Sequence, residues 1–125
     1  MSEFASDRAR RREELVDLAS RYADKVRDQY GPATVLLYGS IARGDFNLWS
    51  DIDVLVVSDA LPLHPLARSE ALQRLVLPGI EPKGLTLREY QDAETRDRPF
   101  VREIAKHCIV LRDDLGLAAN LRSAQ

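Results

Sequence analysis

The chain has 125 residues, a length that predicts one domain, residues 1–125, and leaves no room for a second catalytic domain. Its 18 Lys and Arg residues against 20 Asp and Glu residues give a net charge of −2, which argues against general DNA binding. Hydrophobic residues make up 45% of the chain and charged residues 30%, so we expect a packed core and not a disordered segment.

The first half of the chain alternates between helical and strand-like patterns. Apolar residues recur at helical spacing between Asp7 and Gln29, and the Gly31-Pro32 pair ends that pattern. Two short apolar runs rich in strand formers follow, separated by a turn and a polar segment. In chain order we expect a helix over 1–30, a strand over 33–38, a helical turn over 41–44, a loop over 45–50 and a strand over 51–57.

The second half is predicted to add four helices and two weaker strands. Pro82 and Gly84 interrupt one strand pattern, which favours an edge position in the sheet. Thr86 and Glu89 have the spacing of a capping box, the reciprocal pair that starts a helix. We expect a helix over 63–77, a strand over 80–85, a short helix after Thr86, a helix from Pro99, a strand over 109–111 and a last helix over 113–122.

A Gly-Ser pair precedes an Asp-x-Asp motif at a short, fixed distance. Ten residues separate Ser40 from Asp51, and Asp53 follows two positions later. Residues two apart on a strand share one face, about 7 Å from each other, so the two carboxylates are expected to converge. Adjacent carboxylates repel unless a cation lies between them, and Mg²⁺ prefers oxygen ligands together with substrate phosphates and water. The spacing therefore predicts a magnesium site for phosphoryl or nucleotidyl transfer.

The Gly-Ser pair supplies the other half of such a site. Gly39 lets the backbone approach a phosphate with no Cβ in the way, while Ser40 and the amides after it donate hydrogen bonds. Arg43 is expected to add a bidentate grip on phosphate oxygens. The Gly-Ser pair alone would equally fit a structural turn, and the Asp pair alone a solvated strand end. The combination of the two motifs at this spacing favours a catalytic site over either structural explanation.

At these residues the sequence resembles the nucleotidyltransferase superfamily related to DNA polymerase beta, and most closely its minimal branch, the MNT-type antitoxins. The resemblance runs from Val35 to Leu111. It implies an α/β fold, a small mixed sheet backed by helices, with the catalytic core over 33–111. It also implies a third carboxylate from a later strand, most simply Glu81, as a metal ligand and as the base for the acceptor hydroxyl.

The same resemblance implies the reaction and its partners. The expected activity is transfer of AMP from ATP, or of another nucleotide from its triphosphate, to a hydroxyl of a protein, with two Mg²⁺ ions bound by Asp51, Asp53 and Glu81. The expected acceptor is a HEPN-type toxin, so the chain would be the antitoxin of a toxin–antitoxin pair. An oligomeric complex of the two proteins is one form that this pair could take. An antitoxin that only binds its toxin, with a vestigial nucleotide site, is the alternative, and a small-molecule (antibiotic) adenylyltransferase a weaker one.

Other residues left two interpretations open. Trp49, in the loop before Asp51, is either an exposed anchor for a partner or buried under the loop. The arginine cluster at 8–12 fits a solvated helix face, with a partner or RNA contact as the alternative. Lys83 is placed to pair with phosphate or with Glu81.

The sequence also favours a location inside the cell. The single cysteine, Cys108, excludes an internal disulfide and a cysteine-cluster zinc site and suits a reducing compartment. The longest wholly apolar run, 54–57, is far too short to span a membrane, and the charged N-terminus does not resemble a signal peptide. We therefore expect a cytoplasmic protein with no membrane partner.

Overall fold

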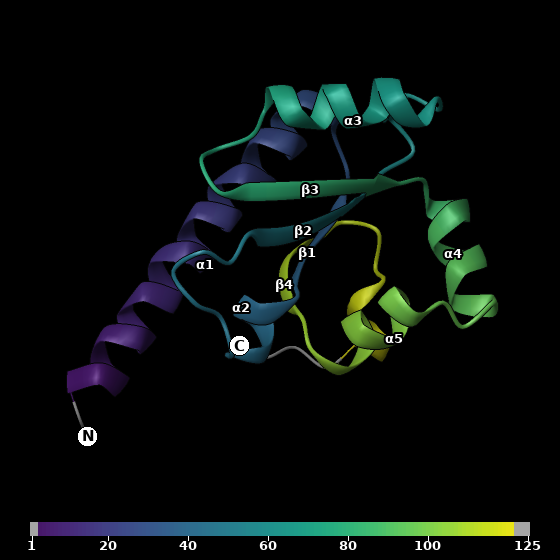
Figure 1. Cartoon of the computed structure of the whole chain (residues 1–125). Helices are drawn as coiled ribbons and strands as arrows, with labels where there is room; N and C mark the ends of the chain where they lie inside the picture. Colours follow the sequence, from purple (N-terminus) through teal and green to yellow (C-terminus); the bar gives the residue numbers. More distant parts are fainter. Residues whose placement is uncertain (1–2, 122–125) are drawn as a thin grey trace.

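The computed structural model describes residues 3–121 as a four-stranded mixed sheet with helices on both faces (Figure 1). The α/β fold predicted from the sequence is confirmed. Along the chain the elements are α1 (Glu3–Tyr30), β1 (Thr34–Tyr38), α2 (Ser40–Arg43), β2 (Ile52–Val57), α3 (Pro65–Arg74), β3 (Ile80–Leu85), α4 (Leu87–Thr95), α5 (Pro99–Lys106), β4 (Ile109–Asp113) and the 3₁₀ turn η1 (Ala118–Asn120). The strand order is β3-β2-β1-β4, in which β1 is antiparallel to β2 and β4 while β2 and β3 are parallel.

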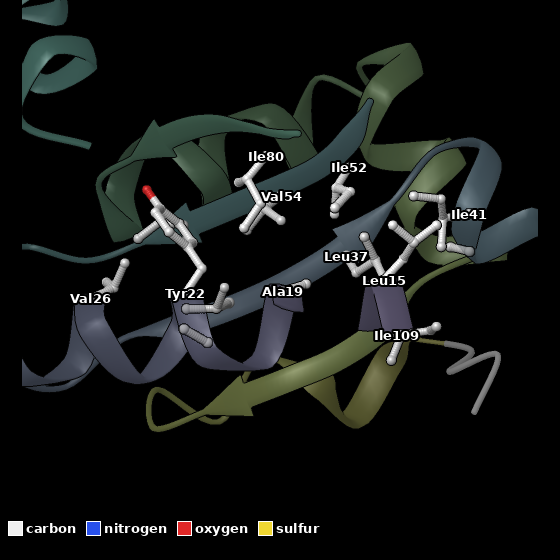
Figure 2. Packing of buried hydrophobic residues seen from close by; sticks show 14 of the residues in the cluster. Leu15, Ala19, Tyr22, Val26, Leu37, Ile41, Ile52, Val54, Ile80 and Ile109 are labelled. Atoms are coloured by element: carbon white, nitrogen blue, oxygen red, sulfur yellow. The ribbon is translucent and has the colours of Figure 1, made fainter. Parts of the chain in front are cut away.

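The long helix α1 covers one face of the sheet. Its residues Leu15, Ala19, Tyr22 and Val26, spaced three or four apart, are buried and point at the strands (Figure 2). The Tyr22 hydroxyl donates to the Leu72 carbonyl at 3.0 Å, which joins α1 to α3 on the same side of the sheet. None of the helices in residues 3–121 has the length and hydrophobicity that a bilayer-spanning helix requires.

The central strand β2 is buried on both faces. Ile52, Val54 and Val56 belong to the core under α1 and α3, while Leu55 and Val57 belong to the core under α4 and α5. A strand covered on both sides is expected to be apolar throughout. Asp53 is the exception in β2, and it lies on the α4/α5 face at the end of the strand where the helices no longer cover the sheet completely.

The strand β3 lies at the edge of the sheet, as its proline and glycine predict. Its parallel pairing with β2 is reached through α3, which packs on β3. The buried Arg68 of α3 donates to the carbonyls of Pro62, Leu63 and Gly84 and to the Glu89 carboxylate, so one guanidinium fixes both ends of this crossover. The capping box at the start of α4 is confirmed, with Thr86 and Glu89 bonding reciprocally.

The last helix predicted over 113–122 is wrong for the part of that range the structure describes; residue 122 lies outside it. Strand β4 continues to Asp113, and only the 3₁₀ turn η1 follows. The Asp113 carboxylate accepts from the amides of Leu117 and Ala118 and from the Thr34 hydroxyl, so it ties this segment to β1. These contacts across the sheet, with Gly116 at φ +72°, favour a compact turn over a helix.

A substitution at Gly84 tests how closely α3 packs on β3. A Cβ at this position would lie 2.6 Å from Leu72 Cδ1 and 2.9 Å from Arg68 Cδ, while the backbone conformation of Gly84 is one that alanine also adopts. Gly84→Ala should therefore destabilise the fold by about 1–3 kcal/mol through overpacking. Denaturant unfolding measures the loss. Leu72→Ala is itself destabilising, but adding Gly84→Ala to it should cost less than in the wild type; a fully additive double variant would contradict the close contact.

Candidate functional site

Three polar side chains form a row across three neighbouring strands. The register pairs Tyr38 of β1 with Asp53 of β2, and Asp53 with Glu81 of β3. Directly paired residues on adjacent strands point to the same face of a sheet, so the row lies on one surface. Asp51 directly precedes β2 and is exposed, Asp53 is half-buried and Glu81 is exposed. The structure thus brings together the three carboxylates that the sequence selected, and adds Tyr38.

The pKa of Asp53 reflects the acidic groups around it. Partial burial raises the pKa of Asp53, and the carboxylates of Asp51 and Glu81 raise it further, while the Arg43 guanidinium lowers it. The pKa of Tyr38 is raised by burial, then by Asp53 and Glu81. Both shifts have the sign expected where negative charges gather in a partly desolvated place. Such a place favours a cation.

Gly39 is the residue that leaves room for Asp53. A Cβ on Gly39 would lie 2.3 Å from Asp53 Oδ2, so any other residue type would displace that carboxylate. Gly39 also has φ +78° and ψ −153°, a conformation that L residues rarely adopt. The glycine of the Gly-Ser pair is therefore required twice, by backbone geometry and by the contact with Asp53.

The single turn α2 follows Gly39 and is anchored by its buried side chains. Ile41 and Ala42 are buried in the α1 core, and Gly44 ends the turn in the left-handed conformation, its amide donating to the Ser40 carbonyl at 2.8 Å. Gly39 brings no side chain that could cap the first amides of α2. The Ser40 hydroxyl and these amides are thus positioned at the end of β1, next to the row of carboxylates.

Two arginines of α1 hold the other end of α2. Arg12 donates to the carbonyls of Ile41 at 3.0 Å and Ala42 at 3.1 Å, and Arg8 donates to the carbonyls of Gly44 and Phe46. The prediction of a merely solvated helix face is wrong for this pair. Their spacing of four places both on one face of α1, a signal that was present in the sequence. That this face meets α2 follows only from the tertiary packing.

Arg43 lies at the site but already has carboxylate partners. Its guanidinium pairs with Glu103 of α5 and with Asp45, at 3.3 Å for the latter. The bond to Glu103 and then the bond to Asp45 raise the pKa of Arg43, so it remains charged. A phosphate bound by Arg43 would have to share or replace these carboxylates. Sequence reasoning missed Glu103, because only the fold brings α5 next to α2.

Lys83 contacts an aromatic ring and not Glu81, and its pairing with phosphate stays a prediction. Its ammonium lies 4.1 Å from the centroid of the Phe100 ring, a cation–π contact between β3 and α5. Lys83 is two residues from Glu81 on the same face of β3. Together with the Arg43–Glu103 pair, this contact fixes α5 against the sheet beside the row of carboxylates.

The donor set suits a hard divalent cation that shares its coordination with a substrate. Among residues 3–121, no group of three or more His, Cys, Asp or Glu side chains is arranged to hold a metal ion unaided. Mg²⁺ does not need one, because it is commonly held by one or two carboxylates with phosphate oxygens and water. Asp51 and Asp53, with Glu81 alongside, provide that kind of partial site.

The contact between Gly39 and Asp53 can be tested by a pair of substitutions. Gly39→Ala should cost about 1–3 kcal/mol of stability from the backbone conformation and more from the clash. Gly44→Ala is the control: its φ of +95° also disfavours alanine, but nothing lies within 4 Å of the new Cβ. In an Asp53→Ala background the cost of Gly39→Ala should fall and that of Gly44→Ala should not. Equal costs in both backgrounds, measured by denaturant unfolding, would rule out the contact.

Comparison with known proteins identifies the family. Residues 19–116 match the family model described as a nucleotidyltransferase domain. A Methanocaldococcus jannaschii protein named "putative protein adenylyltransferase" is 29% identical over a 75-residue alignment that covers 58% of this chain and 51% of that protein, so the chain spans about half the length of this relative. A crystal structure titled as a "putative nucleotidyltransferase" from Sulfolobus solfataricus has the same fold, with a TM-score of 0.59 and 22% identity over 71% of this chain and 78% of that one. Since the family model covers most of the chain, from the middle of α1 to beyond β4, the protein belongs to the nucleotidyltransferase domain family.

Proposed function

We propose that this nucleotidyltransferase moves AMP from ATP to a hydroxyl group of a partner protein, with Mg²⁺ as cofactor. The observation that supports this best is the row of carboxylates on β2 and β3 beside the Gly39-Ser40 turn. A triphosphate needs hydrogen-bond donors for its oxygens and cations for its charge. In this proposal the turn after β1 supplies the donors, and the neighbouring carboxylates bind the cations.

In this proposal the nucleotide is held by α2. The backbone amides after Gly39 and the Ser40 hydroxyl donate to phosphate oxygens, which approach closely because Gly39 has no side chain. Arg43 contributes a guanidinium from the last turn of the same element, exchanging part of its contact with Asp45 or Glu103 for a phosphate oxygen. ATP is the proposed donor; another nucleoside triphosphate would use the same phosphate contacts.

Asp51, Asp53 and Glu81 would hold Mg²⁺. The sequence predicts two such ions in the site. The bound cations would neutralise phosphate charge and lower the cost of transfer. The acceptor oxygen forms a bond to the α-phosphorus, the bond from that phosphorus to the bridging oxygen breaks, and pyrophosphate leaves. Glu81, exposed at the sheet edge, accepts the proton of the acceptor hydroxyl.

The proposed acceptor is a protein, specifically a HEPN-type toxin paired with this chain as its antitoxin. The site lies across β1, β2 and β3, with Asp51 and Glu81 exposed, whereas specific small-molecule pockets enclose most of their ligand. An acceptor that brings its own surface does not need such a pocket. The name of the M. jannaschii relative, a protein adenylyltransferase, supports the same acceptor class. An antitoxin that acts by binding alone is the second candidate, and turnover distinguishes the two.

Asparagine substitutions test the metal ligands. Asp51→Asn and Asp53→Asn should each abolish Mg²⁺-dependent ATP binding and leave the fold intact. A ligand that binds only the native state stabilises it by about 2.7 kcal/mol at a hundredfold excess over its Kd, so thermal melts with and without Mg²⁺-ATP report the loss. Without ligand at neutral pH, Asp53→Asn should melt no lower than wild type, because the raised pKa means that ionising Asp53 costs the folded state stability. Wild-type ligand shifts in both variants would refute the assignment.

Glu81→Gln tests the proposed base. It should slow AMP transfer by about 10²–10⁴-fold while ATP binding changes little, because general-base help is lost but Asp51 and Asp53 remain. Labelled ATP, Mg²⁺ and the candidate partner protein provide the assay, with label on a partner tyrosine as the readout. An unchanged rate would assign the base elsewhere, and absence of label with the wild type would favour the antitoxin that only binds.

A further inference from the structure

Two apolar side chains on the loop between α2 and β2 lie almost entirely in solvent. Leu48 is 86% and Trp49 89% exposed, which settles the open question about Trp49 in favour of exposure. Leu48 is three residues and Trp49 two residues before Asp51 in the sequence. A large aromatic exposed beside a reaction site is the residue type that most often dominates a protein interface.

The loop presents these side chains in a fixed shape. The Trp49 amide donates to Asn47 Oδ1 at 2.8 Å, and the Asn47 amide donates to the Ser50 hydroxyl at 2.9 Å. Phe46 is buried and anchors the start of the loop, with the Arg8 guanidinium 4.3 Å from its ring centroid. Little conformational entropy is therefore lost when a partner covers the loop.

A groove of about 620 Å³ lies between this loop and the N-terminal half of α1, which Figure 1 shows running past the sheet beside the loop. Leu15, Phe46 and Leu48 contribute apolar surface to it, and its charged lining residues are Asp7, Arg8 and Arg11. Exposed apolar groups beside a groove of this kind mark an interaction site.

The charge beside the groove favours one kind of partner. Of the charged residues that line it, Asp7 pairs with Arg10 and Arg11 pairs with Glu14. Arg8 binds the carbonyls of Gly44 and Phe46, which have no net charge, and within the described part of the chain it forms no ion pair with a carboxylate. The positive charge of Arg8 is thus used to hold the end of α2 but is not neutralised. A partner with a carboxylate next to an apolar side chain would complement both properties of the groove.

We propose that Leu48, Trp49 and this groove form the docking surface for the acceptor protein, which inserts an apolar side chain flanked by an acidic one. This inference rests on the proposed function and adds the place where its acceptor binds. Only Ser50 separates Trp49 from Asp51, so a protein seated on Leu48 and Trp49 is held next to the first of the proposed metal ligands along the chain. The nucleotide site and the docking surface share α2 and its loop but use different side chains.

The test compares two pairs of exposed apolar residues. Leu48→Ser with Trp49→Ser removes the proposed contact, while Leu63→Ser with Leu66→Ser removes two leucines of 77% and 63% exposure at the start of α3, beyond the other end of β2. Each protein is incubated with Mg²⁺, ATP labelled at the α-phosphate and a protein extract of the cells of origin, and label on protein is measured. Thermal melts with Mg²⁺-ATP check that nucleotide binding is unchanged.

We expect the loop pair to lose at least about tenfold in transfer, through a higher KM for the acceptor, and the α3 pair to match the wild type. Wild-type transfer by the loop pair would overturn the docking surface and leave the proposed function standing. Absence of label with the wild type itself would instead refute the proposed function.

In that case crosslinking still decides the docking surface. Benzoylphenylalanine replaces Trp49 in one protein and Leu66 in a control, and both are photolysed in the same extract. A protein crosslinked from position 49 and not from position 66, and lost when Leu48→Ser is added, supports the surface. The same crosslinks from both positions, or none from position 49, overturn it.

Discussion

The close approach between the Asp53 carboxylate and the backbone of Gly39 is the constraint on which the rest of the candidate site depends. A Cβ on Gly39 would reach within 2.3 Å of Asp53 Oδ2, so any other residue type at that position would displace the carboxylate. The same contact sets the Gly-Ser turn beside the carboxylates. A motif that looks in sequence like two separate signals, a phosphate turn and a metal pair, is in three dimensions one packed unit.

The turn after Gly39 is too short to stabilise itself. Isolated helices of this length do not persist in water, so α2 depends on tertiary contacts. The side chains of Ile41 and Ala42 are buried in the core, and the Arg12 guanidinium donates hydrogen bonds to the carbonyls of the same two residues. On the opposite side, Arg43 connects it to Glu103 of α5. Helices from both ends of the chain thus determine the position of the four residues proposed to receive the phosphates.

The predictions from the sequence succeeded where one local pattern decides the structure. The apolar run around Asp53, the spacing of α1 and the capping box at Thr86 each specify an element without help from the rest of the chain, and all three are confirmed. The edge position of β3 followed from Pro82 and Gly84 by the same kind of reasoning.

The failures concern residues whose partners are distant in sequence. Asp113 prevents the predicted last helix by bonding to Thr34 and to amides that follow it, and Arg8 and Arg12 are committed to α2 although their sequence context suggests solvent. Arg43 has a partner, Glu103, that the sequence did not indicate, because only the fold brings α5 to it. Pattern reasoning predicts which groups can interact; the partner each one chooses depends on the completed fold.

Solvent exposure differs between the acidic residues of the row, which suits the roles proposed for them as metal ligand and as base. Asp53 lies in β2, inside the sheet, half-buried in the space that Gly39 leaves, with a pKa raised by burial and by its acidic neighbours. Glu81 lies in the edge strand, exposed to an approaching acceptor. A ligand must hold its position throughout the reaction, whereas a base must meet a group that arrives from outside. The strand order β3-β2-β1 produces that difference, because it places one carboxylate inside the sheet and its direct neighbour at the rim.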